Sequence, residues 1–218
     1  MKICGLTSAE AARHAADSGA AYIGLTLFPP SPRSVDLSTA SEIAKVIPSV
    51  TRVALTVDAD NDLIDALSGA GIDMIQLHGK ETPARVASVR DRTGLPVMKA
   101  IGIRGADDLP AIDSYAAVSD QLLIDAKAPE GAIIPGGNGV VFDWRLIAGR
   151  TWPVPWMLAG GLNPENVAEA IRLTGADQVD VASGTETAPG LKDPLKVKDF
   201  IHSAVHGRVA STGDETLG

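Results

Sequence analysis

Short β-rich runs alternate with helical stretches along this 218-residue chain. Several of the β-rich runs are almost continuously apolar, which is typical of parallel strands covered on both faces. The runs that we expect to be strands cover residues 2–4, 22–27, 52–57, 74–77, 97–101, 122–125, 156–159 and 178–182. The segments expected to be helices are rich in alanine and amphipathic, and they cover residues 8–18, 38–47, 61–69, 83–93, 107–116, 142–148, 164–173 and 196–206.

Eight strands alternating with eight helices predict an α/β fold, a single (β/α)8 TIM barrel. The alternative is a doubly wound open sheet, which usually carries a glycine-rich fingerprint after its first strand. Here the first strand ends in Cys4-Gly5-Leu6-Thr7, without the GxGxxG pattern. We therefore expect a barrel domain over residues 1–206. The polar, glycine- and threonine-containing segment 207–218 is expected to be a flexible tail, and the long connection 127–141 to be an active-site loop.

Composition excludes several classes of function. Nineteen Lys and Arg against 27 Asp and Glu give a net charge of −8, and no basic stripe is present, so we expect no nucleic-acid partner. No run approaches the roughly 18 apolar residues of a membrane span, and no secretory leader is recognisable, so a cytoplasmic protein is expected. The single cysteine excludes an internal disulfide, and no Cys/His cluster has the spacing of a zinc site. Both a monomer and a homodimer are compatible with the sequence.

Polar residues at the carboxyl ends of the strands are the candidates for chemistry, because barrel active sites are built there. The side chains in question are Cys4, Arg33, His78, Asp125 and Asp180. Glycines cluster after the last three strands and let backbone amides approach an anion closely, which predicts a phosphate site. Its expected residues are Gly137, Asn138, Gly139, Gly160, Gly161, Ser183 and Gly184. His78, at a strand end, either lines the site or is a core histidine. No second His, Asp or Glu stands at ligand spacing from it, so we expect no metal site.

An ordered set of short motifs resembles the phosphoribosylanthranilate isomerase family of tryptophan biosynthesis over about residues 2–206. The motifs are Lys2-Ile3-Cys4-Gly5-Leu6-Thr7, Ser31-Pro32-Arg33, Gln76-Leu77-His78-Gly79, Gly136-Gly137-x-Gly139 with Phe142-Asp143-Trp144, Leu158-Ala159-Gly160-Gly161-Leu162, and Asp180-x-x-Ser183-Gly184-x-Glu186 with Pro189-Gly190-x-Lys192-Asp193. The resemblance implies a (β/α)8 barrel that needs no cofactor. It implies an Amadori rearrangement of N-(5-phosphoribosyl)anthranilate to 1-(2-carboxyphenylamino)-1-deoxyribulose 5-phosphate, a small phosphorylated substrate.

The resemblance also implies residue roles. Cys4 matches the general base that removes the proton from C2 of the ribose, and Asp125 matches the general acid that protonates the ring oxygen. Arg33 matches the residue that holds the anthranilate, and Asp180 lies near the sugar and the amine. These roles are chemically sensible, because opening an aminosugar ring needs first an acid and then a base. A free thiol has a pKa of about 8.5, so a nearby cation or helix N-terminus would have to favour the Cys4 thiolate.

Four positions depart from the family pattern, and two other functions stay open. Leu25 and Leu55 stand where aromatic residues are usual, Asp58 replaces Asn, and Asn138 replaces Ser or Thr, so we expect altered substrate binding more than lost chemistry. One alternative is a related sugar-phosphate isomerase acting on the histidine-pathway aminoaldose, which would carry a second carboxylate in place of Cys4. The other is a non-catalytic barrel that binds a phosphorylated ligand.

Overall fold

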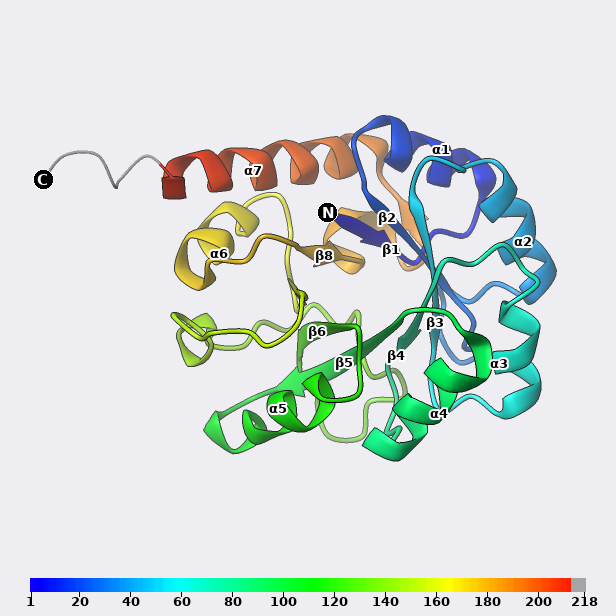
Figure 1. Ribbon diagram of the computed structural model, residues 1–218. Helices are drawn as coiled ribbons and strands as arrows, with labels where there is room; N and C mark the ends of the chain where they lie inside the picture. The colour runs from blue at the N-terminus through cyan, green and yellow to red at the C-terminus, as the bar shows by residue number, and fades with distance from the viewer. Residues whose placement is uncertain (213–218) are drawn as a thin grey trace, which may run out of the picture.

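The computed structural model describes residues 1–212, and residues 213–218 lie outside the described part of the chain. Its main strands are β1 (Lys2–Cys4), β2 (Tyr22–Thr26), β3 (Thr51–Thr56), β4 (Met74–Leu77), β5 (Val97–Ile103), β6 (Gln121–Ala126), β7 (Trp156–Leu158) and β8 (Asp180–Val181). They form one parallel sheet in the order β7-β6-β5-β4-β3-β2-β1-β8. An isolated parallel bridge between Leu158 and Val179 joins its two edges, so the sheet closes on itself (Figure 1). The predicted (β/α)8 barrel is confirmed.

Helices surround this ring of strands (Figure 1). They are α1 (Ala9–Asp17), α2 (Leu37–Lys45), α3 (Asn61–Leu67), α4 (Pro83–Thr93), α5 (Pro110–Ala116), α6 (Val167–Thr174) and α7 (Pro194–Thr212). Local chemistry sets their ends. The Ser8 hydroxyl accepts a hydrogen bond from the amide of Ala11 at the start of α1, and Thr82 caps α4 in the same way. Gly94 and Gly175 end α4 and α6 in the left-handed conformation that glycine adopts without strain.

The helix predicted for residues 142–148 is wrong: the segment forms a single 3₁₀ turn, Trp144–Leu146. Asp143 caps this turn through the amide of Arg145 and also binds the Arg145 guanidinium, so its side chain stabilises a local turn. Gly149 follows with a φ of 68°, which ends the helical conformation. The described chain therefore passes from β6 to β7 without a full helix.

Two further differences lie after β7. Helix α6 begins at Val167 and not at residue 164, because Asn163 Oδ1 accepts hydrogen bonds from the amides of Glu165 and Asn166 and holds a turn there. An antiparallel hairpin of β9 (Glu186–Ala188) and β10 (Leu191–Lys192) follows β8 and was not predicted. This hairpin brings charged side chains to the rim of the barrel.

Helix α7 continues past the predicted end of the domain and reaches Thr212. Residues 207–212, expected to begin a flexible tail, are therefore helical. A Cβ at position 207 would lie 2.8 Å from the Cα of Ala168, so Gly207 lets α7 pack closely on α6. The rest of the predicted tail, residues 213–218, lies outside the described residues.

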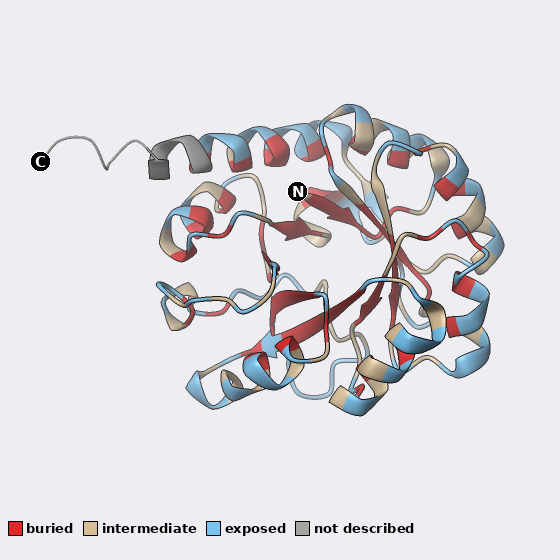
Figure 2. Cartoon of the chain, viewed as in Figure 1, coloured by how far each residue is buried: buried red, intermediate tan, exposed pale blue. Residues whose placement is uncertain are grey.

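The strands contribute to two hydrophobic layers, and Figure 2 shows that their residues are almost all buried. Side chains that point outward pack beneath the helices, and helical residues are buried mainly on the side that faces the sheet. Side chains that point inward fill the barrel, where Met98, Ala100, Leu123, Met157 and Ala159 form a separate apolar cluster. The alternation along each strand thus sends every second residue into the barrel.

A buried ion pair fixes the chain beside the rim. The ammonium of Lys99, on β5, donates to the carbonyls on either side of His78 and to Glu81 Oε2 at 2.6 Å. Glu81 also accepts hydrogen bonds from the amides of Asp58 and Gly79. The pair therefore ties the ends of β3 and β4 together and holds the backbone around His78.

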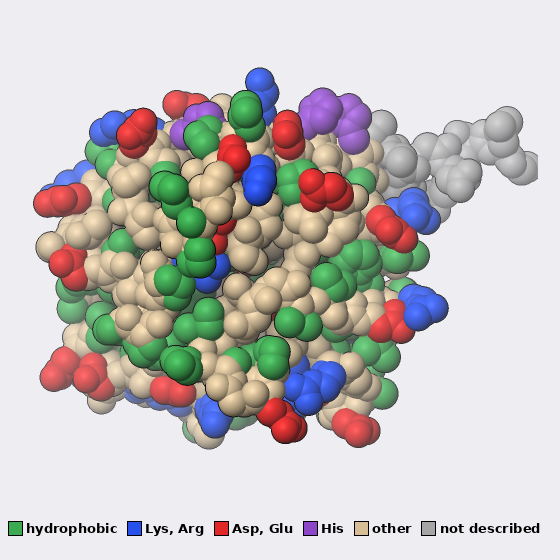
Figure 3. Space-filling view, turned by 180° about the vertical axis from the view of Figure 1, so that it is seen from behind, with side chains coloured by type: hydrophobic (Ala, Val, Ile, Leu, Met, Phe, Trp, Pro, Cys, Tyr) green, Lys and Arg blue, Asp and Glu red, His purple; other side chains and the backbone are tan. Residues whose placement is uncertain are grey.

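The surface is of mixed charge. Figure 3 shows acidic and basic side chains interspersed around the edge of the face opposite to the view of Figure 1. None of the helices among residues 1–212 is long and apolar enough to cross a membrane.

Replacing Lys99 by methionine tests the buried pair. Lys99→Met leaves Glu81 buried without its cation, so we expect the free energy of unfolding to fall by about 3–5 kcal/mol. Urea denaturation measures the change, with the exposed lysine variant Lys198→Met as the control. If Lys99→Met lowers the free energy of unfolding no more than Lys198→Met does, the buried pair does not have the role described here.

Candidate active site

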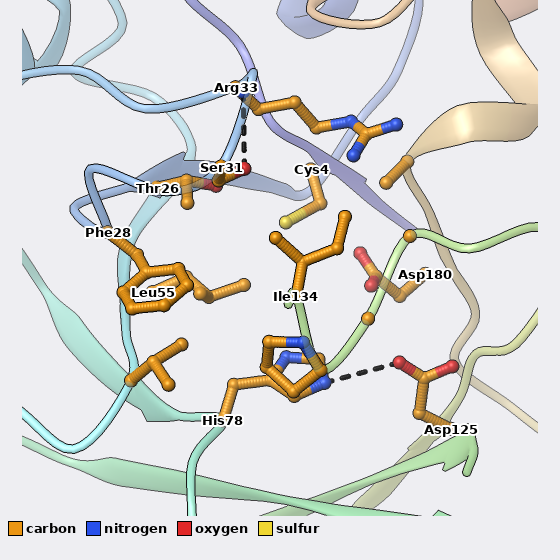
Figure 4. A pocket seen from close by; sticks show the side chains of 15 residues that line it. Cys4, Thr26, Phe28, Ser31, Arg33, Leu55, His78, Asp125, Ile134 and Asp180 are labelled. Carbon is orange, nitrogen blue, oxygen red and sulfur yellow. Dashed lines mark hydrogen bonds and ion pairs between the residues drawn. The ribbon is translucent and has the colours of Figure 1, made fainter. Parts of the chain in front are cut away.

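One pocket at the carboxyl ends of the strands collects most of the predicted side chains (Figure 4). Cys4 from β1, Arg33 from the loop after β2, His78 after β4, Asp125 from β6 and Asp180 from β8 all line it. These residues are brought together because parallel strands end at the same rim of the barrel. In Figure 4, Phe28 and Leu55 lie on one side of the pocket and Asp125 and Asp180 on the other.

The Cys4 side chain points into the barrel and its sulfur faces this pocket (Figure 4). Cys4 pairs in register with Gly24 on β2. A Cβ at position 24 would lie 2.6 Å from the Cys4 Sγ, so a glycine is needed there to make room for the sulfur. Burial raises the pKa of the Cys4 thiol above its ordinary value, although Lys2 and Lys192 act to lower it.

Both oxygens of the Asp125 carboxyl group have close polar partners. Oδ1 accepts from the amide of Ala126 at 2.8 Å, and Oδ2 lies 3.2 Å from the Nε2 of His78. The amide nitrogen of Gln76 lies 3.0 Å from His78 Nδ1. The two nitrogens of the His78 ring thus contact Gln76 on one side and Asp125 on the other. His78 thus lines the pocket and contacts the Asp125 carboxyl group.

Arg33 is anchored by a partner that the sequence did not indicate. Its Nε and Nη2 donate to the two oxygens of Glu186, each at 2.8 Å, and both side chains are buried. Glu186 also accepts from Lys192 at 3.0 Å. The edge of the guanidinium formed by Nε and Nη2 is thus occupied, while Nη1 lies beside Gly137, where a Cβ would be 2.8 Å away. A ligand carboxylate would meet Arg33 from its Nη1 end.

An apolar wall completes the pocket. Phe28, Leu55, Val57 and Ile134 line it. Of the positions that depart from the family pattern, Leu55 is in this wall, whereas Leu25 belongs to the outer core beneath the helices. The aromatic surface that the sequence lacks at those positions is supplied by Phe28.

Asp58 lies outside the pocket lining. Its Oδ1 accepts a hydrogen bond from the amide of Lys80 at 2.7 Å, and its backbone has a φ of 48°. Aspartate and asparagine tolerate this left-handed conformation better than other residues with a side chain. Asp58 therefore stabilises the conformation of the loop after β3.

The glycine loops form hollows next to Asp125 and Asp180. Gly137, Gly160, Gly161 and Ser183 line one of them. Asn138 and Gly139 line an adjoining hollow, where the Asn138 amide donates to a loop carbonyl at 3.2 Å.

Gly160 and Gly161 both have positive φ, at 88° and 64°. A Cβ on Gly160 would lie 2.6 Å from the amide nitrogen of Ala126, so only glycine fits. Gly184 differs from its neighbours, because it packs against the carbonyl of Leu162 and does not line a hollow. Among residues 1–212, no group of three His, Cys, Asp or Glu side chains is placed to hold a metal ion.

Sequence reasoning missed three charged residues of the site. Lys2, Glu186 and Lys192 lie in the quoted motifs but were given no role. Lys2 donates to Asp180 Oδ1 at 2.9 Å and is completely buried. The available signal was a lysine within an apolar run expected to be covered on both faces, where a charge must find a partner.

The pH dependence of stability tests the contacts of Glu186. Burial alone would raise the pKa of Glu186, but Arg33 and Lys192 together hold it below its ordinary value. A carboxyl group with a lowered pKa stabilises the fold above its unfolded pKa of about 4.3, and this contribution is lost as the pH falls through the folded pKa.

We therefore expect Glu186→Gln to lower the free energy of unfolding by about 3 kcal/mol at pH 7. The difference from the wild type should shrink below about pH 4. Urea titrations between pH 7 and pH 3.5 measure it, with exposed Glu42→Gln as the control. A difference that does not change with pH would refute the assignment.

Known proteins resemble this chain over nearly its whole length. A family model described as N-(5'phosphoribosyl)anthranilate (PRA) isomerase matches residues 1–203. The N-(5'-phosphoribosyl)anthranilate isomerase of Cereibacter sphaeroides is 56% identical over 206 residues, covering 94% of this chain and 97% of that protein. That of Paracoccus denitrificans is also 56% identical, over 94% of this chain and 96% of its own length.

Solved structures agree. The crystal structure of phosphoribosyl anthranilate isomerase from Thermotoga maritima superposes with a TM-score of 0.84 at 35% identity, covering 94% of this chain and 98% of that one. A second, in complex with reduced 1-(o-carboxyphenylamino)-1-deoxyribulose 5-phosphate, gives a TM-score of 0.82 at 33% identity, over 94% of this chain and 97% of the other. The chain belongs to the N-(5'-phosphoribosyl)anthranilate isomerase family.

Proposed function

We propose that this chain converts N-(5-phosphoribosyl)anthranilate to 1-(2-carboxyphenylamino)-1-deoxyribulose 5-phosphate, a step of tryptophan biosynthesis. The observation that carries the proposal is that Cys4 and Asp125, on separate strands, open onto one pocket beside the glycine loops. The ligand of the solved relative, a reduced form of this product, supports the same substrate class.

The first step is acid catalysis by Asp125. Its proton passes to the ring oxygen, the bond from that oxygen to C1 breaks, and the lone pair of the amine forms a C1=N double bond. His78 assists by holding the carboxyl group and by sharing the proton through Nε2. Gln76 holds the other side of the His78 ring, with its amide nitrogen 3.0 Å from Nδ1.

The second step is base catalysis by Cys4. The thiolate takes the proton from C2, the C2–H electron pair forms C1=C2, and the C1=N electrons return to nitrogen. The enolamine then gains a proton at C1 and loses the one on its C2 hydroxyl, which gives the ketone. The protein itself only gives and takes protons while the C1–O bond breaks and the double bonds shift within the substrate, so an acid and a base on facing strands are sufficient.

The remainder of the pocket positions the substrate. The anthranilate ring lies against Phe28, Leu55 and Ile134, and its carboxylate meets the Nη1 end of Arg33. Asp180, between the two reacting residues, contacts the sugar hydroxyls or the amine. The phosphate is bound by backbone amides of the loops with Gly137, Asn138, Gly139, Gly160, Gly161 and Ser183, where the glycines allow close approach. Gly184, which the sequence also suggested, instead lets its loop pack against Leu162.

The activity and the two roles are tested together. Turnover of freshly made phosphoribosylanthranilate is followed by loss of its fluorescence in the wild type, Cys4→Ala and Asp125→Asn. We expect both variants to lose at least about 10²-fold in kcat, which is normal for removal of a general acid or base. Asp199→Asn, an exposed aspartate on α7, is the matched control and should keep full activity.

The outcomes separate function from mechanism. If a folded wild-type protein does not turn over the substrate, the proposed function is wrong. If it does and either variant retains its kcat, the role given to that residue is wrong.

Arg33 is tested by the conservative change Arg33→Lys. Lysine keeps the charge but cannot bind Glu186 and a ligand carboxylate at once, because it lacks the fork of the guanidinium. We expect KM to rise by about tenfold or more, with a smaller change in kcat, since the carboxylate is distant from the reacting atoms. Steady-state kinetics measures both constants, and an unchanged KM would contradict the assignment.

A further inference from the structure

We propose that Lys2 is a positioning residue for the proton transfer at C2: its buried ammonium, assisted by Lys192, is the counter-ion that allows Cys4 to exist as a thiolate. The inference rests on the role of Cys4 proposed above and extends it. It gives a function to a buried lysine that the acid–base steps do not use.

The position of Lys2 follows from the alternation of β1. Lys2 and Cys4 are two residues apart, so both side chains enter the barrel while Ile3 packs outward. The Lys2 side chain is completely buried. Its ammonium is 2.9 Å from Asp180 Oδ1, and Asp180 lines the same pocket as Cys4. A buried cation thus lies on the same face of β1 as the sulfur, one layer deeper in the barrel, and it interacts electrostatically with Cys4.

A second group of charges faces Cys4 from the loops above. The Lys192 ammonium, on β10, donates to the carbonyl of Ala182 at 2.6 Å and to Glu186 at 3.0 Å. Glu186 also binds Arg33. Lys192 interacts electrostatically with Cys4, as Lys2 does. We call Lys2, Asp180, Lys192, Glu186, Arg33 and Cys4 the Cys4 charge cluster.

The charges of this cluster balance when Cys4 is ionised and Lys192 is protonated. Burial lowers the pKa of Lys192, and its contact with Glu186 acts against that shift. Asp125 and His78 face Cys4 across the same pocket from β6 and from the end of β4, and they form a separate pair. Three cations, Lys2, Arg33 and Lys192, face two carboxylates, those of Asp180 and Glu186, and all five side chains are buried. With a neutral thiol the cluster carries one excess positive charge, and with a thiolate its net charge is zero. Buried charges require partners, so the cluster favours the ionised sulfur.

Removing Lys2 reverses this balance. Without it, two cations face two carboxylates, and ionising Cys4 would add a third negative charge next to Asp180. Burial already disfavours the Cys4 thiolate, so Lys2 offsets much of that cost. Removing Asp180 favours the thiolate, because the cluster with a neutral thiol then carries two excess positive charges instead of one. The cluster thus predicts opposite shifts for two substitutions within one ion pair.

Alkylation of the protein by iodoacetamide tests the proposal without substrate. Cys4 is the only cysteine in the sequence, so the rate of carbamidomethylation, followed by mass spectrometry, reports Cys4 alone. The reagent is neutral, so its approach does not depend on the charge of the site. Rates between pH 6 and pH 10 give the pH at which half the sulfur is thiolate.

For Lys2→Met we expect this midpoint to rise by about one unit or more, a roughly tenfold lower rate at pH 7. For Asp180→Asn we expect it to fall, and Lys2→Arg, which keeps the charge, should stay near the wild type. Lys198→Met, on the exposed face of α7, is the control for the loss of a lysine and should not differ from the wild type.

Shifts in the same direction for Lys2→Met and Asp180→Asn would show general loosening of the site and overturn the proposal, as would unchanged midpoints. If circular dichroism shows that Lys2→Met does not fold, Lys192→Met and Asp180→Asn replace it as the test. A higher alkylation midpoint for Lys192→Met together with a lower one for Asp180→Asn supports the proposal. Any other pair of results refutes it. Because no substrate is used, these results stand whether or not the isomerase activity is found.

Discussion

The parallel hydrogen bonding of the eight strands, closed by the bridge between Leu158 and Val179, is the constraint on which the site depends. Parallel strands all end at the same rim, so residues far apart in the chain become neighbours there. Lys2 and Asp180, which are separated by 178 positions, pair in register across β1 and β8. Closure of the sheet therefore brings the acid, the base and their charge partners together, and the loops complete the pocket.

Charge inside this barrel is organised in pairs that serve different parts of the rim. Lys99 and Glu81 hold the backbone on both sides of His78, which in turn orients Asp125. Lys2 and Asp180 form a second pair, beside Cys4. Each reacting group thus has its own supporting pair. Such pairs contribute little net stability compared with apolar packing, but removing one partner is costly, which fixes the geometry of the groups that they support.

Much of the fold was predictable because its signals are local. The apolar runs identified all eight strands, and the order of strand ends placed Cys4, His78, Asp125 and Asp180 at one rim. The helix expected at residues 142–148 was wrong because a side-chain cap at Asp143 competes with helix formation, and hydrophobic periodicity does not report such caps.

The charge partners were not predictable for a different reason. Glu186 lies in a hairpin whose position depends on the completed barrel, so its contact with Arg33 leaves no trace in the neighbouring sequence. The same holds for Lys192 and for the partner of Lys2. The sequence indicates which residues must be paired, and the tertiary structure determines with which.

The alternation along β1 has a consequence for how this protein can change during evolution. Ile3 packs into the outer core, whereas Lys2 and Cys4, its two neighbours, carry the charge and the sulfur of the site. A shift of one residue in this strand would place a lysine in the hydrophobic layer and an isoleucine in the pocket. Selection for folding and selection for chemistry therefore act on the same three residues, and β1 should accept few amino-acid substitutions. The helical shell, whose outer face touches neither the core nor the site, is where the sequence is free to diverge.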